Sequence, residues 1–181
     1  MPSSRIIVAG LSLVTAVAAS AMLMTPALAS PASTTGIGQY KSWSSAQRAA
    51  GFRLKKPRTT YGLKMNGRIV VDKCVVTGHF GSRVVDAQYG SFSKHQLGLE
   101  QDNAGISCTV GPAGPLLGSY RVDGVTARLH GYCGSGTGHS CRSQRIELML
   151  TWKNGTHYYI ASSYNEPRSH LVHFARTLRN A

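Results

Sequence analysis

The segment from Arg145 to Ser162 constrains the fold more than any other part of the sequence. Apolar and polar side chains alternate along its first half, where the apolar members are Ile146, Leu148, Leu150 and Trp152. A period of two predicts a strand with one buried face, and the Asn154-Gly155 pair that follows is typical of a tight turn. Thr156 to Ser162 predicts the returning strand of a β-hairpin. Asn154-Gly155-Thr156 also matches the N-glycosylation sequon, but turn formation already explains Asn and Gly.

Further segments extend the predicted sheet toward the N-terminus. Residues 68–77, 83–89 and 96–101 are strand-like segments separated by glycine-containing stretches. Between Ser119 and His130, Asp123-Gly124 separates two alternating runs, which predicts a second hairpin. We therefore expect an α+β domain with a curved, mostly antiparallel sheet.

Two short helices are predicted to accompany this sheet. Ser42 to Ala50 contains good helix formers, a serine cap and Gly51 as a stop. After Pro167, apolar residues recur at helical spacing, namely Leu171, Phe174, Ala175 and Leu178. Arg176 and Arg179 then lie at the negative end of the helix dipole. We expect the C-terminal helix to pack on the sheet.

The N-terminus predicts export from the cytoplasm. Arg5 precedes an uncharged apolar run that reaches Met24 and is followed by Ala27-Leu28-Ala29, the layout of a secretory signal peptide cut before Ser30. We expect a signal peptide over residues 1–29, a flexible leader over 30–39 and a single secreted, disulfide-bonded domain over 40–181. Retention of the apolar run as a membrane anchor is the alternative. After cleavage we expect no membrane span.

Four cysteines in an exported chain predict two disulfide bonds. Three pairings are possible, and we favour Cys74 with Cys108 and Cys133 with Cys141, because the second pair brackets a flexible glycine-rich segment. The alternative is a zinc site built from His130, Cys133, His139 and Cys141, whose donor types suit tetrahedral zinc. The oxidising compartment favours the disulfides, so we expect no metal and no cofactor.

The chain is strongly basic, with a formal net charge of +13. A basic exported protein meets anionic cell-wall or extracellular polymers first, and these are the expected partners beside a protein partner. The densest basic segment, and the candidate anion-binding site, consists of Arg53, Lys55, Lys56 and Arg58. The alternative is a solvated surface without a dedicated ligand, because interleaved aromatic residues are scarce there.

Motifs for catalysis are weak, so we name no catalytic residue. Ser91-Phe-Ser-Lys94 has the Ser-x-x-Lys spacing of penicillin-recognising enzymes, but it falls between two predicted strands and is interpreted as a loop. His170 and His173 share one side of a predicted helix without further metal ligands. The seven acidic residues are dispersed along the sequence, which disfavours a glycosidase with paired carboxylates. The Gly134 to Gly138 segment could cradle a phosphate, but a surface loop explains it more simply.

The closing pattern Leu150-Thr-Trp-Lys-Asn-Gly-Thr-His-Tyr-Tyr-Ile-Ala-Ser162, followed by Phe174-Ala-Arg-Thr-Leu178, resembles the end of an uncharacterised extracytoplasmic domain family of Gram-positive bacteria. Ala50 to Pro57 and Leu97 to Gln101 are similar to its opening and middle strands. Members occur as secreted proteins, as lipoproteins and as outer parts of anti-sigma regulators. The resemblance implies an antiparallel sheet with a few helices and no catalytic residues. Four cysteines, and the lack of a lipidation cysteine, depart from that pattern.

These observations together predict a secreted, basic, non-catalytic binding or cell-envelope-associated protein. One alternative is a small secreted hydrolase that uses Ser or His residues. A second is a secreted inhibitor or interaction module that inserts the loop between Cys133 and Cys141 into a partner. The ligand, the disulfide connectivity and the oligomeric state stay open at this point.

Overall fold

A computed structural model describes residues 36–79, 81–109, 114–133 and 146–181, which contain ten strands and two helices. Along the chain these elements are β1 (Gly38–Tyr40), α1 (Trp43–Ala50), β2 (Lys55–Lys56), β3 (Ile69–Lys73), β4 (Arg83–Gly90), β5 (Gln96–Asp102), β6 (Leu116–Val122), β7 (Val125–Cys133), β8 (Ile146–Asn154), β9 (His157–Tyr164), α2 (Arg168–Arg176) and β10 (Arg179–Asn180). Strand β1 begins two residues before the predicted start of the domain.

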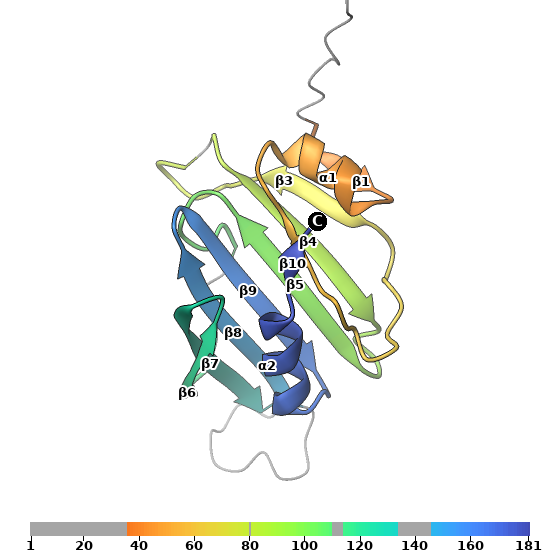
Figure 1. The fold of residues 1–181 in the computed structure, drawn as a ribbon, viewed down its shortest axis with the longest axis vertical. Coiled ribbons are helices and arrows are strands. Elements are labelled where there is room, and N and C mark those ends of the chain that lie inside the picture. Colours follow the sequence, from red (N-terminus) through yellow and green to blue (C-terminus); the bar gives the residue numbers. More distant parts are fainter. Residues whose placement is uncertain (1–35, 80, 110–113, 134–145) are drawn as a thin grey trace, which may run out of the picture. The chain divides into compact units, whose positions relative to one another are not determined.

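Eight of the strands form one antiparallel sheet in the order β1-β3-β4-β5-β9-β8-β7-β6 (Figure 1). The chain builds one half of this sheet with β1, β3, β4 and β5, crosses to the opposite edge at β6, and returns inward to β9. The predicted α+β class with a mostly antiparallel sheet is confirmed. The predicted curvature is not confirmed, because the sheet is not strongly curled.

Both predicted hairpins are present, although one turn differs in detail. Asp123 and Gly124 have φ angles of 55° and 79°, as the turn between β6 and β7 requires. Asn154 pairs with His157 in the register of β8 and β9, so the second turn consists of Gly155 and Thr156 rather than Asn154 and Gly155. Asn154 Nδ2 instead donates to Asp123 Oδ2 at 2.7 Å, which ties the two hairpins together.

Helix α1 begins and ends where its capping residues predict, whereas α2 ends at Arg176, so the prediction that Leu178 and Arg179 belong to this helix is wrong and Arg179 lies in β10. Ser42 caps α1 by accepting the amide of Ser45, and Gly51 ends it in the left-handed conformation with φ 75°. Pro167 directly precedes α2. Both helices contribute to one apolar cluster, through Ala46 and Ala49 of α1 and Leu171 and Phe174 of α2. They therefore cover the same face of the sheet, as Figure 1 shows.

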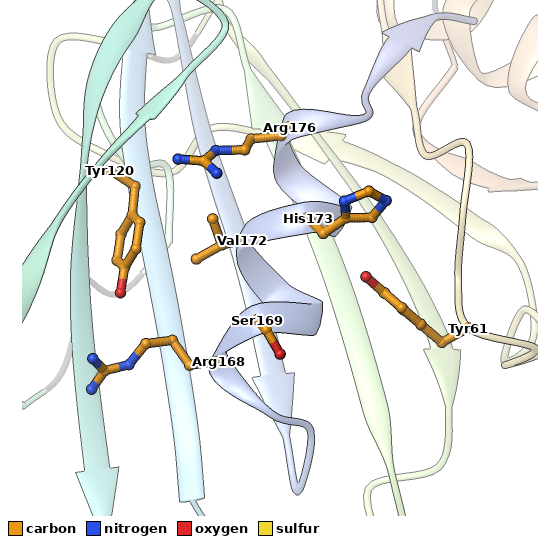
Figure 2. A pocket seen from close by; sticks show the side chains of 7 residues that line it. All are labelled: Tyr61, Tyr120, Arg168, Ser169, Val172, His173 and Arg176. Atoms are coloured by element: carbon orange, nitrogen blue, oxygen red, sulfur yellow. The ribbon is translucent and has the colours of Figure 1, made fainter.

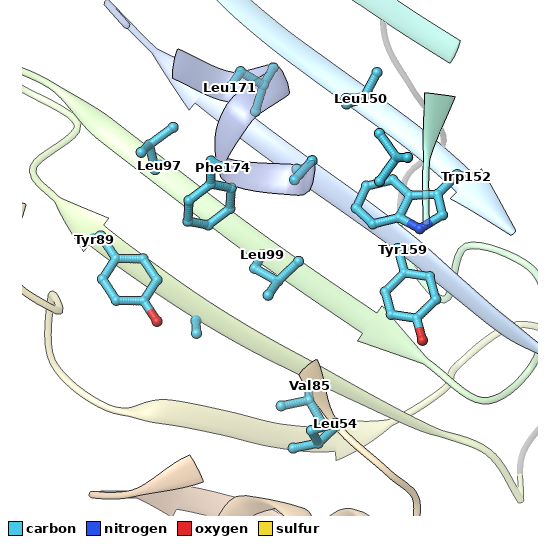
Figure 3. Packing of buried hydrophobic residues seen from close by; sticks show 14 of the residues in the cluster. Leu54, Val85, Tyr89, Leu97, Leu99, Leu150, Trp152, Tyr159, Leu171 and Phe174 are labelled. Carbon is cyan, nitrogen blue, oxygen red and sulfur yellow. The ribbon is translucent and has the colours of Figure 1, made fainter. Parts of the chain in front are cut away.

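This covered face carries the hydrophobic core (Figure 3). Phe174 is fully buried and meets Tyr89 edge-on, with ring centroids 6.1 Å apart. Trp152 and Tyr159, from neighbouring strands, stack at 5.1 Å. The buried strand residues of the cluster are Ile69, Val71, Val85, Ala87, Tyr89, Leu97, Leu99, Val122, Ala127, Leu129, Leu148, Leu150, Trp152, Tyr159 and Ala161.

Side chains at the alternate strand positions point to the opposite side, which we call the open face. In β4, for example, Val85 and Ala87 are buried in the core, whereas Asp86 and Gln88 belong to the open face. In the described ranges neither helix packs on the open face. The loop 103–109 covers the open face at one end of β4 and β5. There, Cys108 of the loop and Cys74, which follows β3, pack on Val84.

A second, two-stranded sheet pairs β2 with β10 and was not predicted. The fully buried side chain of Gln101 joins it to the main sheet. Its Oε1 accepts the amide of Lys55 at 2.7 Å, and its Nε2 donates to the carbonyl of the same residue at 2.8 Å. The buried amide thus has partners for both of its ends, which removes the cost of burying it.

The predicted bond between Cys74 and Cys108 is present, with Cα atoms 4.9 Å apart. The predicted bond between Cys133 and Cys141 involves positions outside the described residues. None of the described helices is long and apolar enough to cross a lipid bilayer.

At the outer edge of the sheet, the pairing of β6 with β7 is interrupted by a bulge between Leu116 and Gly118.

Candidate anion-binding groove

A groove of about 570 Å³ runs along α2 on the covered side of the molecule. Strand β6 contributes Tyr120, and the loop before β3 contributes Tyr61. Figure 2 shows Arg168 and Arg176 directed toward Tyr120 on one side of the helix, with His173 and Tyr61 on the other. The helix contributes Arg168, Ser169, Val172, His173 and Arg176 to the lining.

Arg168 and Arg176 give the groove its charge. They are eight residues apart, which corresponds to a rise of about 12 Å along a helix. Val172 lies between them, one helical turn from each. Both arginines are exposed, and within the described part of the chain neither one forms an ion pair. Arg176 Nε donates to the carbonyl oxygen of Arg121 at 3.0 Å. This hydrogen bond orients the Arg176 side chain and leaves the other N–H groups of its guanidinium for a ligand.

Tyr61 is held in an uncommon backbone conformation at the opposite wall. Its φ of 53° lies in the left-handed region, which is unfavourable for a bulky side chain. Its ring stacks on His170, with centroids 3.8 Å apart and planes 7° from parallel, and meets His173 edge-on. The pKa of the Tyr61 hydroxyl is raised, mainly by desolvation and to a smaller extent by the negative charge of Glu166. The phenol is therefore a neutral hydrogen-bond donor at physiological pH.

Glu166 fixes the first turn of α2 against the β4–β5 connection. Its side chain is only 7% exposed, and its carboxylate contacts His170 Nδ1 at 2.6 Å and His95 Nδ1 at 3.2 Å. His95 Nδ1 also lies 2.8 Å from the carbonyl oxygen of Asn165, and Asn165 Nδ2 donates to the carbonyl of Lys94. Glu166 thus has partners on two elements, and it supports His170 beneath Tyr61.

The side chains of the predicted basic segment lie in different surroundings, and anion binding by this segment stays a prediction. Lys55 is an ion-pair partner of Asp123 and lies over the ring of Tyr159, 5.7 Å from its centroid. Burial by itself would raise the pKa of Asp123, but the hydrogen bonds from Lys55 and Asn154 outweigh it and lower that pKa. Lys56 is half-buried in β2, while Arg53 and Arg58 are exposed. Two of the four predicted residues are therefore part of the packed structure.

The other sequence motifs acquire structural explanations. Ser91 and Lys94 lie in the connection between β4 and β5, where Ser91 Oγ bonds Ser93 Oγ at 2.8 Å. In the described ranges no serine hydroxyl bonds a histidine ring, and no group of three His, Cys, Asp or Glu side chains suits a metal ion. Of the glycine-rich segment and the predicted zinc ligands, only His130 has a described side chain, and its Nδ1 lies 3.2 Å from the carbonyl of Gly114.

Carboxylates that are dispersed in the sequence come together on the open face. Asp86 of β4 and Glu100 of β5 are direct cross-strand neighbours, Asp72 lies on the adjacent strand β3, and Asp102 follows Glu100 on β5. A groove of about 380 Å³ contains Asp72, Asp86 and Glu100. Glu100 and Asp102 are two residues apart in one strand and so share a face, which is the signal that could have predicted this cluster.

Burial raises the pKa of three of these carboxyl groups. It brings the pKa of Glu100 to about 7 and that of Asp102 to about 6, and it also raises the pKa of Asp86. Hydrogen bonds oppose the shift, since Thr109 Oγ1 lies 3.0 and 2.9 Å from the two oxygens of Glu100. A group that brings positive charge to this surface would be favoured there.

Comparison of the chain with known protein families, with curated protein sequences and with solved structures finds no match.

Proposed function

We propose that the protein is a secreted, non-catalytic binding protein of the cell exterior, and that the groove along α2 binds anionic groups of an extracellular polymer. The observation that carries this proposal is the pair of guanidiniums, Arg168 and Arg176, that face one groove without carboxylate partners in the described part of the chain. Guanidinium forks suit phosphate and carboxylate oxygens.

The aromatic wall adds a second reason to assign the ligand to this groove. Tyr120 lies between the two arginines, and Tyr61 offers a hydroxyl from the other side. A polymer with regularly spaced charges could contact both guanidiniums at once, and the net charge of +13 would draw it to the surface. The hydrolase alternative has no comparable support, since no serine hydroxyl bonds a histidine ring among the described residues.

The proposal is tested by titrating the protein with inorganic polyphosphate at several salt concentrations. We expect binding to weaken steeply with salt, because each neutralised phosphate releases counterions. Arg168→Glu combined with Arg176→Glu should weaken binding at least tenfold and flatten the salt dependence. Titration with polygalacturonate then distinguishes phosphate from carboxylate ligands.

Arg53→Glu combined with Arg58→Glu is the matched control, because it makes the same change in charge on two exposed arginines outside the groove. We expect it to cost much less affinity. If the control weakens binding as much as the groove variant does, net charge or the basic segment of Arg53 and Arg58 governs binding rather than the groove, and the proposal is wrong.

The predicted export is tested separately by expressing the full chain in a bacterium that secretes proteins. We expect the protein outside the cytoplasm with Ser30 as its first residue, as N-terminal sequencing would show. A cytoplasmic product that keeps Met1 would contradict the secreted location without bearing on the groove.

A further inference from the structure

A hollow of about 350 Å³ lies on the open face, over strands β7, β8 and β9. Five of the residues that line it carry polar side chains and occupy alternate strand positions that point to this face, namely Thr126 and Arg128 of β7, Thr151 and Lys153 of β8, and Tyr158 of β9. The α2 groove lies on the covered side, so the sheet separates the groove from this hollow.

Two cations face the hollow from neighbouring strands. Arg128 pairs with Thr151 across the β7–β8 ladder, and Lys153 follows Thr151 by two positions. The two basic residues are therefore diagonal neighbours, whose Cα atoms lie about 7 to 8 Å apart. At this separation a guanidinium and an ammonium can both reach one anionic group.

The carboxyl groups of the open face do not neutralise these cations. Counting only the residues that the structure describes, neither Arg128 nor Lys153 forms an ion pair. Glu147 is on the same face of β8 but precedes Thr151 by four residues, which corresponds to about 13 Å along a strand. Asp102, which pairs with Tyr158 from β5, is fully buried.

Lys153 is placed at the edge of the hollow by a glycine. Its Nζ lies against Gly105 of the loop 103–109, and a β-carbon at position 105 would be 3.0 Å from this nitrogen. The missing side chain thus leaves room for the ammonium beside the loop. No hydrogen bond to a described residue accompanies this contact, so the N–H groups of Lys153 stay available to a ligand.

A buried hydroxyl group without a partner forms part of the floor. Thr151 is only 6% exposed, and its hydroxyl bonds no group in the part of the chain that the structure describes. Buried polar groups normally have a hydrogen-bond partner, which a ligand in the hollow would supply. The hydroxyls of Thr126 and Tyr158 also lack a described partner and line the same hollow.

We propose that this hollow is a second ligand site and that it binds one acidic sugar unit, a pyranose that carries a carboxylate or a phosphate. The two cations match the acid group. The three hydroxyls match sugar hydroxyls, which donate and accept hydrogen bonds as they do. The volume lies near the lower end of the range for ligand pockets, about 300 to 1,000 Å³, and suits a single ring. A bare anion would leave the hydroxyls unused.

Titration with D-galacturonate, followed through the amide chemical shifts, tests the site. We expect a Kd of about 1 to 10 mM for so small a ligand, with the largest shifts at Thr126, Thr151 and Tyr158. Galactose lacks the acid group and acetate lacks the ring, so each should bind roughly fivefold more weakly or worse. Glucose 6-phosphate, compared with inorganic phosphate, shows whether the acid group is a phosphate.

Variants separate the roles of the cations and of the buried hydroxyl. Arg128→Gln and Lys153→Gln should each raise the Kd for galacturonate roughly fivefold or more. Thr151→Val keeps the shape of the side chain, and should weaken galacturonate binding without changing acetate binding. Arg179→Gln is the matched control, because it removes the same charge from an exposed strand residue outside the hollow. Circular dichroism of each variant verifies that it is folded.

Three results would overturn the proposal: no saturable binding of either acidic sugar, shifts that map to α2 instead of the open face, or acetate and inorganic phosphate binding as tightly as the matching sugars. Arg168→Glu combined with Arg176→Glu should leave the galacturonate Kd close to that of the unmodified protein at physiological salt. Arg128→Gln should leave polyphosphate binding close to that of the Arg179→Gln control. The proposed function and the second site can therefore fail independently.

Discussion

The two faces of the eight-stranded sheet use their side chains in opposite ways. On the covered face, Leu97, Leu99 and Leu150 are fully buried beneath the helices. On the open face, the same strands present Glu100, Met149 and Lys153. In a chain with only seven acidic residues, four lie together on β3 to β5 of the open face. The covered face therefore carries the hydrophobic core, and the open face carries most of the acidic side chains.

The largest expected difference between the faces concerns packing. Phe174→Ala removes a fully buried ring from the centre of the covered face and should lower the free energy of unfolding by about 3 to 5 kcal/mol. Met149→Ala on the open face should cost much less, because Met149 is only partly buried. Urea denaturation of both variants measures the contrast. Equal losses would contradict the assignment of the core to one face.

A somewhat smaller effect is expected from the bond between Cys74 and Cys108, which are 34 residues apart. Replacing both cysteines by serine should cost about 3 to 4 kcal/mol in the loop-entropy description. The same change should loosen the loop that covers Val84 at one end of the open face. Thermal unfolding measures the loss, and protection of the Val84 and Asp102 amides from hydrogen exchange locates it. A loss of protection across the whole sheet would contradict this local role.

Glu100→Gln should stabilise the protein by about 1 to 3 kcal/mol at pH 8 and have little effect at pH 4. Burial raises the pKa of Glu100 from an ordinary value near 4.5 to about 7 in the folded chain. Between these values the folded state keeps a proton that the unfolded state releases, so stability falls as pH rises through this window. The Glu100→Gln variant does not titrate at this position, so its free energy of unfolding does not fall in this window for this reason.

Urea denaturation from pH 4 to pH 8 measures this difference. Glu147→Gln is the control, because Glu147 is an exposed carboxyl group on β8. A Glu100→Gln variant that loses stability at pH 8 would show that the ionised carboxylate is favourable in the single chain.

The smallest effect is expected at the rim of the covered face, where Lys55 pairs with Asp123. Lys55→Met keeps most of the packing and removes the charge, and should cost about 0.2 to 1 kcal/mol. Thermal unfolding at low and high salt measures the loss, which should shrink as salt increases. A loss of several kcal/mol would mean that this ion pair contributes as much as the core.

Much of the main sheet could be predicted from the sequence, because alternation and turn residues are local signals. The hairpin of β8 and β9 follows from eighteen neighbouring residues, and Ser42 and Gly51 delimit α1. The small sheet could not be predicted, because β2 and β10 contain two residues each and lie more than a hundred positions apart. The residues around Lys55-Lys56 do not indicate that Gln101 will bond the Lys55 backbone or that Asp123 will pair with the Lys55 side chain.

The groove was missed for a similar reason, since Tyr61, Tyr120 and α2 meet only after folding. One signal was available: Arg168, Val172 and Arg176 recur every four residues and so share one side of a helix. Lys55, which belongs to the segment where basic residues are dense in sequence, instead pairs with Asp123 within the fold.

The bulge between Leu116 and Gly118 has a consequence for how the chain avoids uncontrolled self-association. An open sheet ends in strands whose unsatisfied amides and carbonyls can recruit further strands and seed fibres. Here one border is β1, only three residues long, and the other is β6, whose regular ladder is broken by the bulge. Growth of the described sheet by lateral addition is therefore discouraged at both borders.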